Sequence, residues 1–191
     1  MLNLVLFGKP GSGKGTQANF LKDKYDLIHI STGDVFRKNI KNQTELGVKA
    51  QGYTQNGELV PDDVTVSMLE NEIKQNLPCN GFIFDGFPRT LQQADEMNKI
   101  LFKYKMELSA IVALEVDDDL LTDRLLKRGL ISGRSDDQSR EKILTRLNEY
   151  RNKTEPLIDY YSKINRFHTV SGVGEINEIS SRLLDLIESV R

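Results

Sequence analysis

The chain has 191 residues, of which 28% are charged, and its formal net charge is −2. This length suits one α/β domain with small insertions and a sizeable core. The near balance of charge lacks the basic excess of a nucleic-acid-binding protein, and the longest apolar runs, such as residues 110–114, are too short to span a membrane.

The N-terminus and the few cysteine and histidine residues bear on location and metal binding. No signal-peptide pattern precedes the first apolar run. Cys79 is the only cysteine, which excludes an intrachain disulfide and a cysteine-ligated zinc site. His29 and His168 fall in expected strands, where we interpret them as structural. We therefore expect a cytoplasmic protein without zinc that binds neither nucleic acid nor membrane.

Apolar segments and helical stripes alternate along the chain. We expect strands over residues 2–7, 27–30, 82–85, 109–116 and 166–170. Helical periodicity is seen in residues 17–25 and 120–128, and in three stripes: Val66, Leu69, Ile73, Leu77; Ala94, Met97, Leu101, Tyr104; and Ile176, Ile179, Leu183, Ile187, Val190. This alternation predicts an α/β fold with a parallel sheet covered by helices on both faces.

Residues 8–16 read Gly-Lys-Pro-Gly-Ser-Gly-Lys-Gly-Thr and lie between the first strand and the first helix. Strand, glycine-rich turn and helix form the context of a phosphate-binding loop, in which backbone amides and the helix start surround an anion. Lys14 would place its ammonium group on the outer phosphates. Thr16 follows Lys14 by two positions instead of one, so its hydroxyl is less clearly placed as a magnesium ligand.

The third strand ends at Asp85, which is followed by Gly-Phe-Pro-Arg. A carboxylate at the end of a strand beside a phosphate loop suits Mg²⁺, bound directly or through water; the alternative is an Asp that caps a turn. Arg89 would face the same site and grip a second phosphate. Thr90 and Gln93 have the spacing of a capping box, so Gln93 either supports its helix or contacts a ligand.

Residues 31–34, Ser-Thr-Gly-Asp, are ambiguous in the same way, because Ser31 and Asp34 also have capping-box spacing. They begin a helix that carries Arg37, which is near enough to contact an anion.

Two segments interrupt the alternation of strands and helices. Residues 31–60 are polar and contain several glycines without a strand, and residues 128–137 form a short, charged connection. Arg124 and Arg128 share one helix face, Arg134 lies in the connection and Arg146 in the next helix. A single arginine at a helix end commonly balances the helix dipole, but a group of four around one loop favours a polyphosphate ligand.

At this point the chain resembles the adenylate kinase family over nearly its whole length. The resemblance rests on residues 8–17, on Ser-Thr-Gly-Asp at 31–34 with Arg37, on 57–62, on Asp-Gly-Phe-Pro-Arg-Thr at 85–90, on 128–129 with 132–134, and on 154–156. The shifted hydroxyl of Thr16 is a feature of that family. Lys9 departs from it, because the family more often has a small apolar residue there.

The resemblance implies a P-loop nucleoside-triphosphate hydrolase-like three-layer fold with a five-stranded parallel sheet and two small mobile flaps. The core would comprise residues 1–30, 61–127 and 138–191. Residues 31–60 would form the AMP-binding flap and residues 128–137 a short lid that closes over the site and excludes water.

The implied reaction is MgATP + AMP ⇌ 2 ADP, with Mg²⁺ as cofactor and ATP, AMP and ADP as ligands of a monomeric enzyme. The implied catalytic residues are Lys14, Arg89, Arg128, Arg134 and Arg146. The implied ATP site comprises Gly11, Ser12, Gly13, Lys14, Gly15, Thr16, Arg124, Arg128 and Gly174. The implied AMP site comprises Thr32, Arg37, Glu58, Leu59, Val60, Gly86, Phe87, Pro88, Arg89, Gln93, Arg134 and Arg146. Asp85 would hold the metal through water.

Three other functions share part of this pattern. A UMP/CMP kinase has the same loop and the Gly-Phe-Pro-Arg turn, but Thr32 and Gln93 favour an adenine acceptor. A GTPase-type switch would carry an Asn-Lys-x-Asp stretch, which this sequence lacks. A kinase of another small metabolite would leave the acceptor-side arginines unexplained.

Overall fold

The computed structural model describes residues 1–190, apart from the side chain of Asp119, so the last position of the expected core segment 138–191 lies outside it. Its centre is a five-stranded sheet of β1 (Leu4–Phe7), β2 (Ile28–Ser31), β3 (Phe82–Asp85), β4 (Ala110–Glu115) and β5 (Phe167–Ser171). The strand order is β2-β3-β1-β4-β5, and every neighbouring pair is parallel. The predicted fold class is therefore confirmed.

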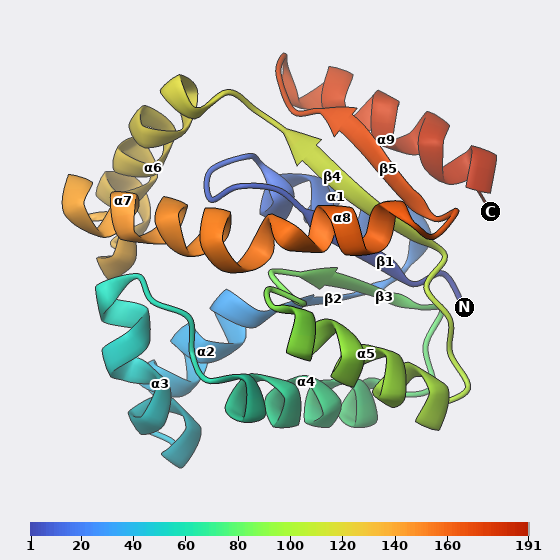
Figure 1. Cartoon of the computed structure of the whole chain (residues 1–191), viewed down its shortest axis with the longest axis horizontal. Helices are drawn as coiled ribbons and strands as arrows, with labels where there is room; N and C mark the ends of the chain where they lie inside the picture. Colours follow the sequence, from blue (N-terminus) through green and yellow to red (C-terminus); the bar gives the residue numbers. More distant parts are fainter. Residues whose placement is uncertain (191) are drawn as a thin grey trace.

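Helices follow or separate the strands (Figure 1). They are α1 (Lys14–Tyr25), α2 (Thr32–Lys41), α3 (Glu45–Asn56), α4 (Asp62–Asn76), α5 (Leu91–Lys103), α6 (Asp118–Ser132), α7 (Arg140–Glu149), α8 (Pro156–Ser162) and α9 (Ile176–Val190), with a short 3₁₀ turn η1 (Ser135–Asp137) and a π-helical turn η2 (Tyr150–Thr154). Each predicted strand is present, with shifts of one or two residues at most ends.

The three inner strands of the sheet, β1, β3 and β4, are apolar and buried at nearly every position, so helices cover both faces of the sheet centre. In β1, Val5 and Phe7 pack into the cluster beneath α4, α5 and α8, whereas Leu4 and Leu6 pack into the cluster beneath α1 and α9. The predicted stripes supply the opposing sides, with Leu69 of α4 among the buried residues of the first cluster. The helices thereby place the carboxyl ends of all five strands at one end of the molecule.

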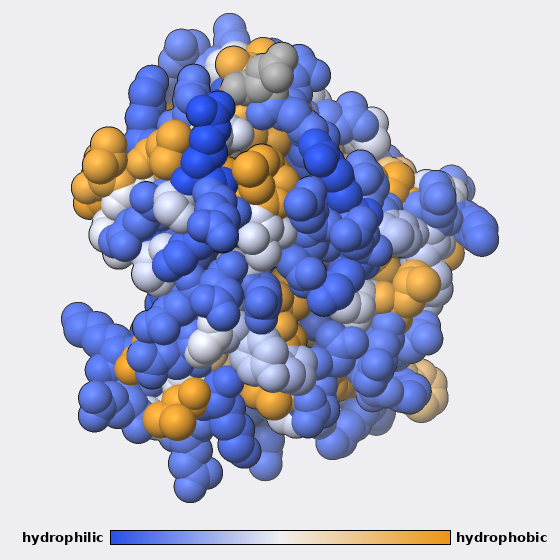
Figure 2. Space-filling view, turned by 60° about the vertical axis from the view of Figure 1, so that its left-hand side comes forward, coloured by the Kyte–Doolittle hydropathy of each residue, from blue (hydrophilic) through white to orange (hydrophobic). Residues whose placement is uncertain are grey.

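Two helical pairs project at that end (Figure 1). In one, α2 and α3 pack with α4 around Phe36 and Ala50; in the other, α6 and α7 enclose Leu125 and Ile143. Because each pair has its own small cluster, each forms a compact unit beside the strand ends. Figure 2 shows this end of the molecule, where the surface is mainly hydrophilic and the hydrophobic side chains lie in separate small patches.

The connection expected over residues 128–137 is largely helical, which corrects the sequence analysis. Helix α6 continues to Ser132 instead of ending near Arg128, and η1 follows after Gly133. Gly129 permits this arrangement, because a Cβ at that position would lie 2.6 Å from the carbonyl oxygen of Asp137. The end of α6 therefore packs directly against η1, which positions the acidic residues of that turn.

Among the described residues, no helix has both the length and the apolar character that a bilayer crossing requires.

Gly81 tests how tightly the chain is packed where the inner strands β3 and β1 begin. Its φ is +151°, and a Cβ there would overlap the backbone of Leu2, whose carbonyl oxygen accepts the N–H of Phe82. We expect Gly81→Ala to lower the free energy of unfolding by about 2–4 kcal/mol. In contrast, Gly52→Ala, at an open and exposed position inside α3, should raise it by about 0.5–1 kcal/mol. Urea unfolding measures both, and equal stabilities would contradict this packing.

Candidate functional site

A cleft of about 620 Å³ opens at the carboxyl ends of the strands. The phosphate loop forms its floor, residues from β2 to α4 form one wall, and the turn after β3 forms another. Residues of α6, η1, α7 and η2 close the remaining side. This position is where parallel α/β folds bind ligands, since β1 is the strand at which the chain order reverses.

The phosphate loop has the conformation that its glycines predict. Gly11 and Gly13 have φ values of +88° and +98°, and Gly13 caps the start of α1. The ammonium group of Lys14 donates to the carbonyl oxygens of Gly8 at 2.6 Å and of Lys9 at 3.0 Å, so it folds back over the loop. The loop and its lysine thus form one preorganised anion cradle.

Lys14 and Asp85 interact electrostatically on the floor of the cleft. Burial lowers the pKa of Lys14 to about 8; Arg89 and two further arginines lower it as well, while Asp85 opposes them. Burial alone would raise the pKa of Asp85, but a hydrogen bond with His29 (3.4 Å) and the charge of Lys14 outweigh burial and lower that pKa below its usual value. Asp85 is therefore an ionised carboxylate at the cleft.

Arg89 is held by the turn after β3. Its Nε donates to the carbonyl oxygen of Gly86 at 2.7 Å, and the hydroxyl of Thr32 donates to the same oxygen at 2.9 Å. Gly86 has a φ of +76°, and a Cβ there would lie 2.6 Å from the Arg89 guanidinium. A glycine is thus required where this arginine turns into the cleft, and burial lowers the pKa of Arg89.

Gln93 has the structural role expected from its spacing, with one difference. The hydroxyl of Thr90 accepts the N–H of Gln93 and caps α5, as predicted. The side-chain oxygen of Gln93 accepts the N–H of Arg89 at 2.8 Å, one residue before the cap, and its amide nitrogen donates to Asp62 at 2.7 Å. A primary amide has two N–H groups and two lone pairs, so Gln93 keeps one of each for a ligand.

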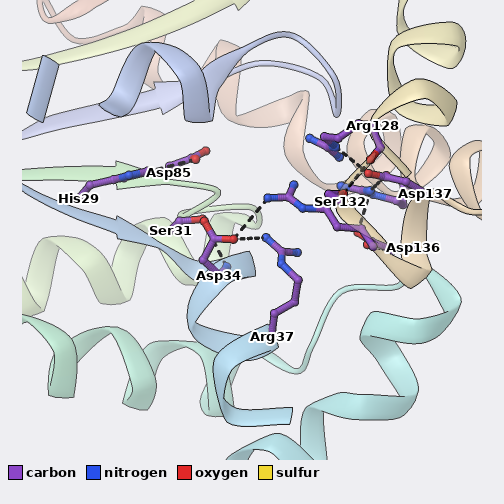
Figure 3. Close-up of polar contacts among 11 residues, drawn as sticks. His29, Ser31, Asp34, Arg37, Asp85, Arg128, Ser132, Asp136 and Asp137 are labelled. Atoms are coloured by element: carbon purple, nitrogen blue, oxygen red, sulfur yellow. Dashed lines mark hydrogen bonds and ion pairs between the residues drawn. The ribbon is translucent and has the colours of Figure 1, made fainter. Parts of the chain in front are cut away.

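Asp34 connects two arginines from opposite walls of the cleft (Figure 3). One of its oxygens accepts Arg37 of α2 at 2.5 Å and Arg134, which precedes η1, at 3.4 Å. Ser31 caps α2 by accepting the N–H of Asp34 at 3.4 Å, which confirms the capping interpretation. Residues 31–34 therefore also place a carboxylate between two guanidinium groups.

Two acidic residues of η1 hold Arg128 and Arg146 (Figure 3). Asp137 accepts Arg128 Nε at 2.6 Å and also pairs with Arg146, which makes a second ion pair with Asp136 at 2.7 Å. One nitrogen of Arg128, Nη2, and one oxygen of Asp136 are buried without a hydrogen-bond partner among the described residues. A buried guanidinium N–H without an acceptor is costly, which marks Arg128 as ready to receive an anion.

The cleft brings together nearly every residue that the sequence analysis singled out. Its lining includes Gly11, Ser12, Gly13, Lys14, Gly15, Thr16, Thr32, Arg37, Glu58, Leu59, Val60, Asp85, Gly86, Pro88, Arg89, Gln93, Arg124, Arg128, Arg134, Arg146 and Gly174. The exception is Phe87, which is only 1% exposed and packs in the core cluster behind the turn. Phe87 therefore supports the wall without facing the cleft.

Sequence reasoning missed several carboxylates that position the site residues. Asp62 anchors Gln93, and Asp136 and Asp137 hold Arg128 and Arg146. A signal for the η1 pair was present: a cluster of arginines that is partly buried without its ligand requires counter-charges nearby. The Asp-Asp pair directly after Arg134 and Ser135 meets that need.

The arrangement favours a ligand with several negative charges. Burial is the main cause that lowers the pKa of Arg134 and of Arg146, and neighbouring arginines add to it. The same crowding means that bound phosphate groups would relieve repulsion among the cations. The cations reach the cleft from two sides, one beside the phosphate loop and one beside Arg37 and Arg89, so the geometry suits two anionic groups facing each other.

Comparisons with known proteins agree with this geometry. The family model described as "Adenylate kinase" matches residues 6–166. An adenylate kinase of Flavobacterium psychrophilum is 55% identical over 190 residues, covering 100% of both chains. Another, of Porphyromonas gingivalis, is 46% identical over 191 residues and covers 100% of this chain and 98% of the relative. A third, of Leptospira biflexa, is 43% identical over 187 residues, covering 98% of this chain and 100% of the relative.

The pKa of Lys14 predicts how stability changes with pH. Below pH 8 the lysine is protonated in both states, and the folded state bears the full cost of burying the charge. Between pH 8 and 10.5 the folded state releases its proton first, so stability rises with pH. Lys14→Met removes this cost and should be more stable than the native chain by about 1–3 kcal/mol at pH 7, with a smaller advantage at pH 10.

Urea unfolding of both proteins at pH 7 and pH 10 measures this difference. Lys22→Met, which replaces an exposed lysine of the same helix, serves as the control and should show no such pH dependence. A Lys14→Met variant that is less stable at pH 7, or whose advantage is the same at both pH values, would show that Lys14 is not a buried cation.

Proposed function

The chain belongs to the adenylate kinase family, and on that premise we propose how its cleft divides between two nucleotides. The enzyme is a phosphotransferase that catalyses the reversible transfer of a phosphoryl group from ATP to AMP, giving two ADP. The observation that carries the division is that cationic side chains converge from two opposite walls on one cleft.

The donor, ATP, occupies the half formed by the phosphate loop. The amides of residues 11–16 and the ammonium group of Lys14 bind its phosphates. Arg128 adds its Nη2, which has no hydrogen-bond partner among the described residues. Arg124 lies on the same face of α6 and pairs with no described residue, so its guanidinium is available to stack on the adenine. The backbone at Gly174 lies beside the donor base.

The acceptor, AMP, occupies the half between α2 and the turn after β3. Arg37 and Arg89 bind its phosphate, with Asp34 and Gly86 as their resting partners. Thr32, Gly86, Pro88 and Gln93, together with Glu58, Leu59 and Val60, surround the base and ribose, and Phe87 supports that wall from behind. Gln93 contacts the base through the N–H and the lone pair that it does not use within the protein.

Arg134 and Arg146 lie between the two halves and act on the group in transit. Phosphoryl transfer asks little covalent chemistry of a protein, so positioning and charge stabilisation provide most of the rate. The phosphate of AMP is already ionised and needs no strong general base. The arginines hold two mutually repelling anions in line, and residues 31–60 and 128–137, as flap and lid, exclude the water that would otherwise accept the phosphoryl group.

Asp85 fits the magnesium ion that we propose as cofactor. It is ionised at the edge of the cleft, whereas the described residues contain no group of three or more carboxylate, histidine or cysteine side chains able to hold a metal by themselves. Mg²⁺ is commonly held by one or two carboxylates, waters and substrate phosphates. Asp85 would hold the ion through water, and the ion would neutralise charge on the phosphate oxygens. A cytoplasmic location and a monomeric state stay predictions.

Loss of a central cation should abolish most turnover. We expect Lys14→Met and Arg89→Ala each to lower the rate of ADP formation by about 10³-fold, within the range seen for arginines that act on phosphoryl transition states. Phosphorus NMR of a mixture with ATP, Mg²⁺ and AMP measures the rate, and circular dichroism verifies folding. Arg140→Ala, at an exposed position of α7, is the control. Near-normal rates in either folded variant would refute its role.

The hydroxyl of Thr32 should contribute to acceptor choice. Thr32→Ala removes a hydrogen-bonding group worth about 1 kcal/mol at the acceptor wall, so the ratio of kcat/KM for AMP to that for UMP or CMP should fall about five- to tenfold. Thr145→Ala is a matched control, since its hydroxyl also donates to a carbonyl oxygen but does not line the cleft. An unchanged ratio in Thr32→Ala would exclude the role of Thr32 in selection.

A further inference from the structure

The loop between β5 and α9, residues 171–175, borders the cleft at Gly174 and is held from outside by one guanidinium group. Nη1 of Arg182 donates to the carbonyl oxygen of Ser171 at 3.0 Å and to that of Val173 at 2.7 Å. Arg182 lies on α9 and is 41% exposed, and its own carboxylate neighbour, Glu178, is 3.9 Å away. One side chain thus binds two carbonyl oxygens of the loop, two residues apart.

Other hydrogen bonds also hold this loop, among them one within it, from the N–H of Val173 to the hydroxyl of Ser171 at 3.4 Å. At the start, the N–H of Gly172 donates to the carbonyl oxygen of Glu115 at 2.8 Å. At the end, Gln17 of α1 donates to the carbonyl oxygen of Ile176 at 3.1 Å. Between these points, the side chain of Glu178 accepts the N–H of Glu175 at 3.0 Å. The carbonyl oxygen of Val173, next to Gly174, is bound by Arg182.

The conformation of Gly174 makes this support necessary. Its φ is +122°, and a side chain there would overlap the carboxylate of Glu178. Glycine loses more conformational freedom on ordering than any other residue, and exposed loops sample many conformations unless their backbone is bonded. A loop with a glycine at the point of contact therefore depends on its neighbours for a fixed shape.

We infer that Arg182 is a positioning residue for the donor site: it holds residues 171–174 in the conformation that receives the base of ATP. This inference rests on the proposal that Gly174 lies beside the donor base. Because Arg182 does not itself line the cleft, its loss acts through the loop. Ordering the loop would then be part of the cost of binding ATP.

Loss of the Arg182 side chain should weaken the binding of ATP alone, without changing the binding of AMP or the chemical step. Without Arg182 the loop is ordered only when ATP enters, so the KM for ATP should rise about three- to tenfold. The AMP half and the transferring cations do not contact this loop, so the KM for AMP and the kcat at saturation should change less than twofold. A variant that merely destabilised the fold would not separate the two substrates in this way.

Hydrogen exchange of the native enzyme first tests the premise. The amides of residues 171–176 should be protected by MgATP without AMP, and not by AMP alone. Absence of protection by MgATP would overturn the donor-site assignment of Gly174, and the role of Arg182 with it. Protection in the native enzyme establishes the assignment independently of any variant.

Steady-state kinetics of Arg182→Ala and Arg182→Lys then test the role of the side chain. The alanine variant should show faster exchange of residues 171–176 in the absence of ligand and the higher KM for ATP, and the lysine variant should recover part of both. Arg166→Ala is the matched control. Arg166, which directly precedes β5, binds the carbonyl oxygen of Leu108 and the carboxylate of Glu107 and does not line the cleft.

The results distinguish the donor-site assignment of Gly174 from the positioning role of Arg182. If MgATP protects the native loop but Arg182→Ala leaves the KM for ATP and the loop exchange unchanged, the positioning role is overturned while the donor site stands. The same holds if Arg166→Ala raises the KM for ATP equally, or if Arg182→Ala raises the KM for AMP by the same factor. A rise confined to ATP, with partial recovery by lysine, supports the role.

Discussion

Repulsion among buried cations is the constraint on which this structure depends. One lysine and several arginines converge on a single cleft, and burial lowers the pKa of Lys14, Arg89 and Arg146. Without counter-charges such a cage would be unstable in the absence of ligand. The protein supplies carboxylates for most of it: Asp85 near Lys14, Asp34 beside Arg37 and Arg134, and the two acidic residues of η1 beside Arg128 and Arg146. Asp34 and the η1 carboxylates hold their arginines by ion pairs, and bound phosphates would share or replace that role.

The parallel sheet determines where these cations and carboxylates meet. Parallel strands end side by side, so the loop after β1 and the turn after β3 lie next to each other although they are about 70 residues apart in the chain. The floor carries Lys14 and Asp85, and the turn after β3 carries Arg89, whereas Arg37, Arg128 and Arg146 come from helical pairs with small clusters of their own. Asp34 joins these pairs across the cleft. This ion pair keeps the arginines of the two helical pairs close to each other, beside the floor formed by the core.

Local signals in the sequence were sufficient to predict the phosphate loop and two helix caps. The phosphate loop was identified because its glycines, lysine and flanking elements lie within a few turns of chain, where backbone sterics alone restrict the conformation. The caps at Ser31 and Thr90 were correct for the same reason. The predicted end of α6 was wrong, because a glycine such as Gly129 commonly marks the end of a helix. Here the glycine lies inside α6 and allows η1 to pack against the helix.

By itself, the sequence determined the fold class, the family resemblance and which cations surround the site, because periodicity, glycines and motif order are properties of adjacent residues. Only the tertiary structure decided which carboxylate faces which cation, that Phe87 lies behind the wall, and that Arg182 holds the loop at Gly174. Those pairings join residues brought together by packing of separate elements. Their energies depend on burial and distance, which no spacing along the chain reveals.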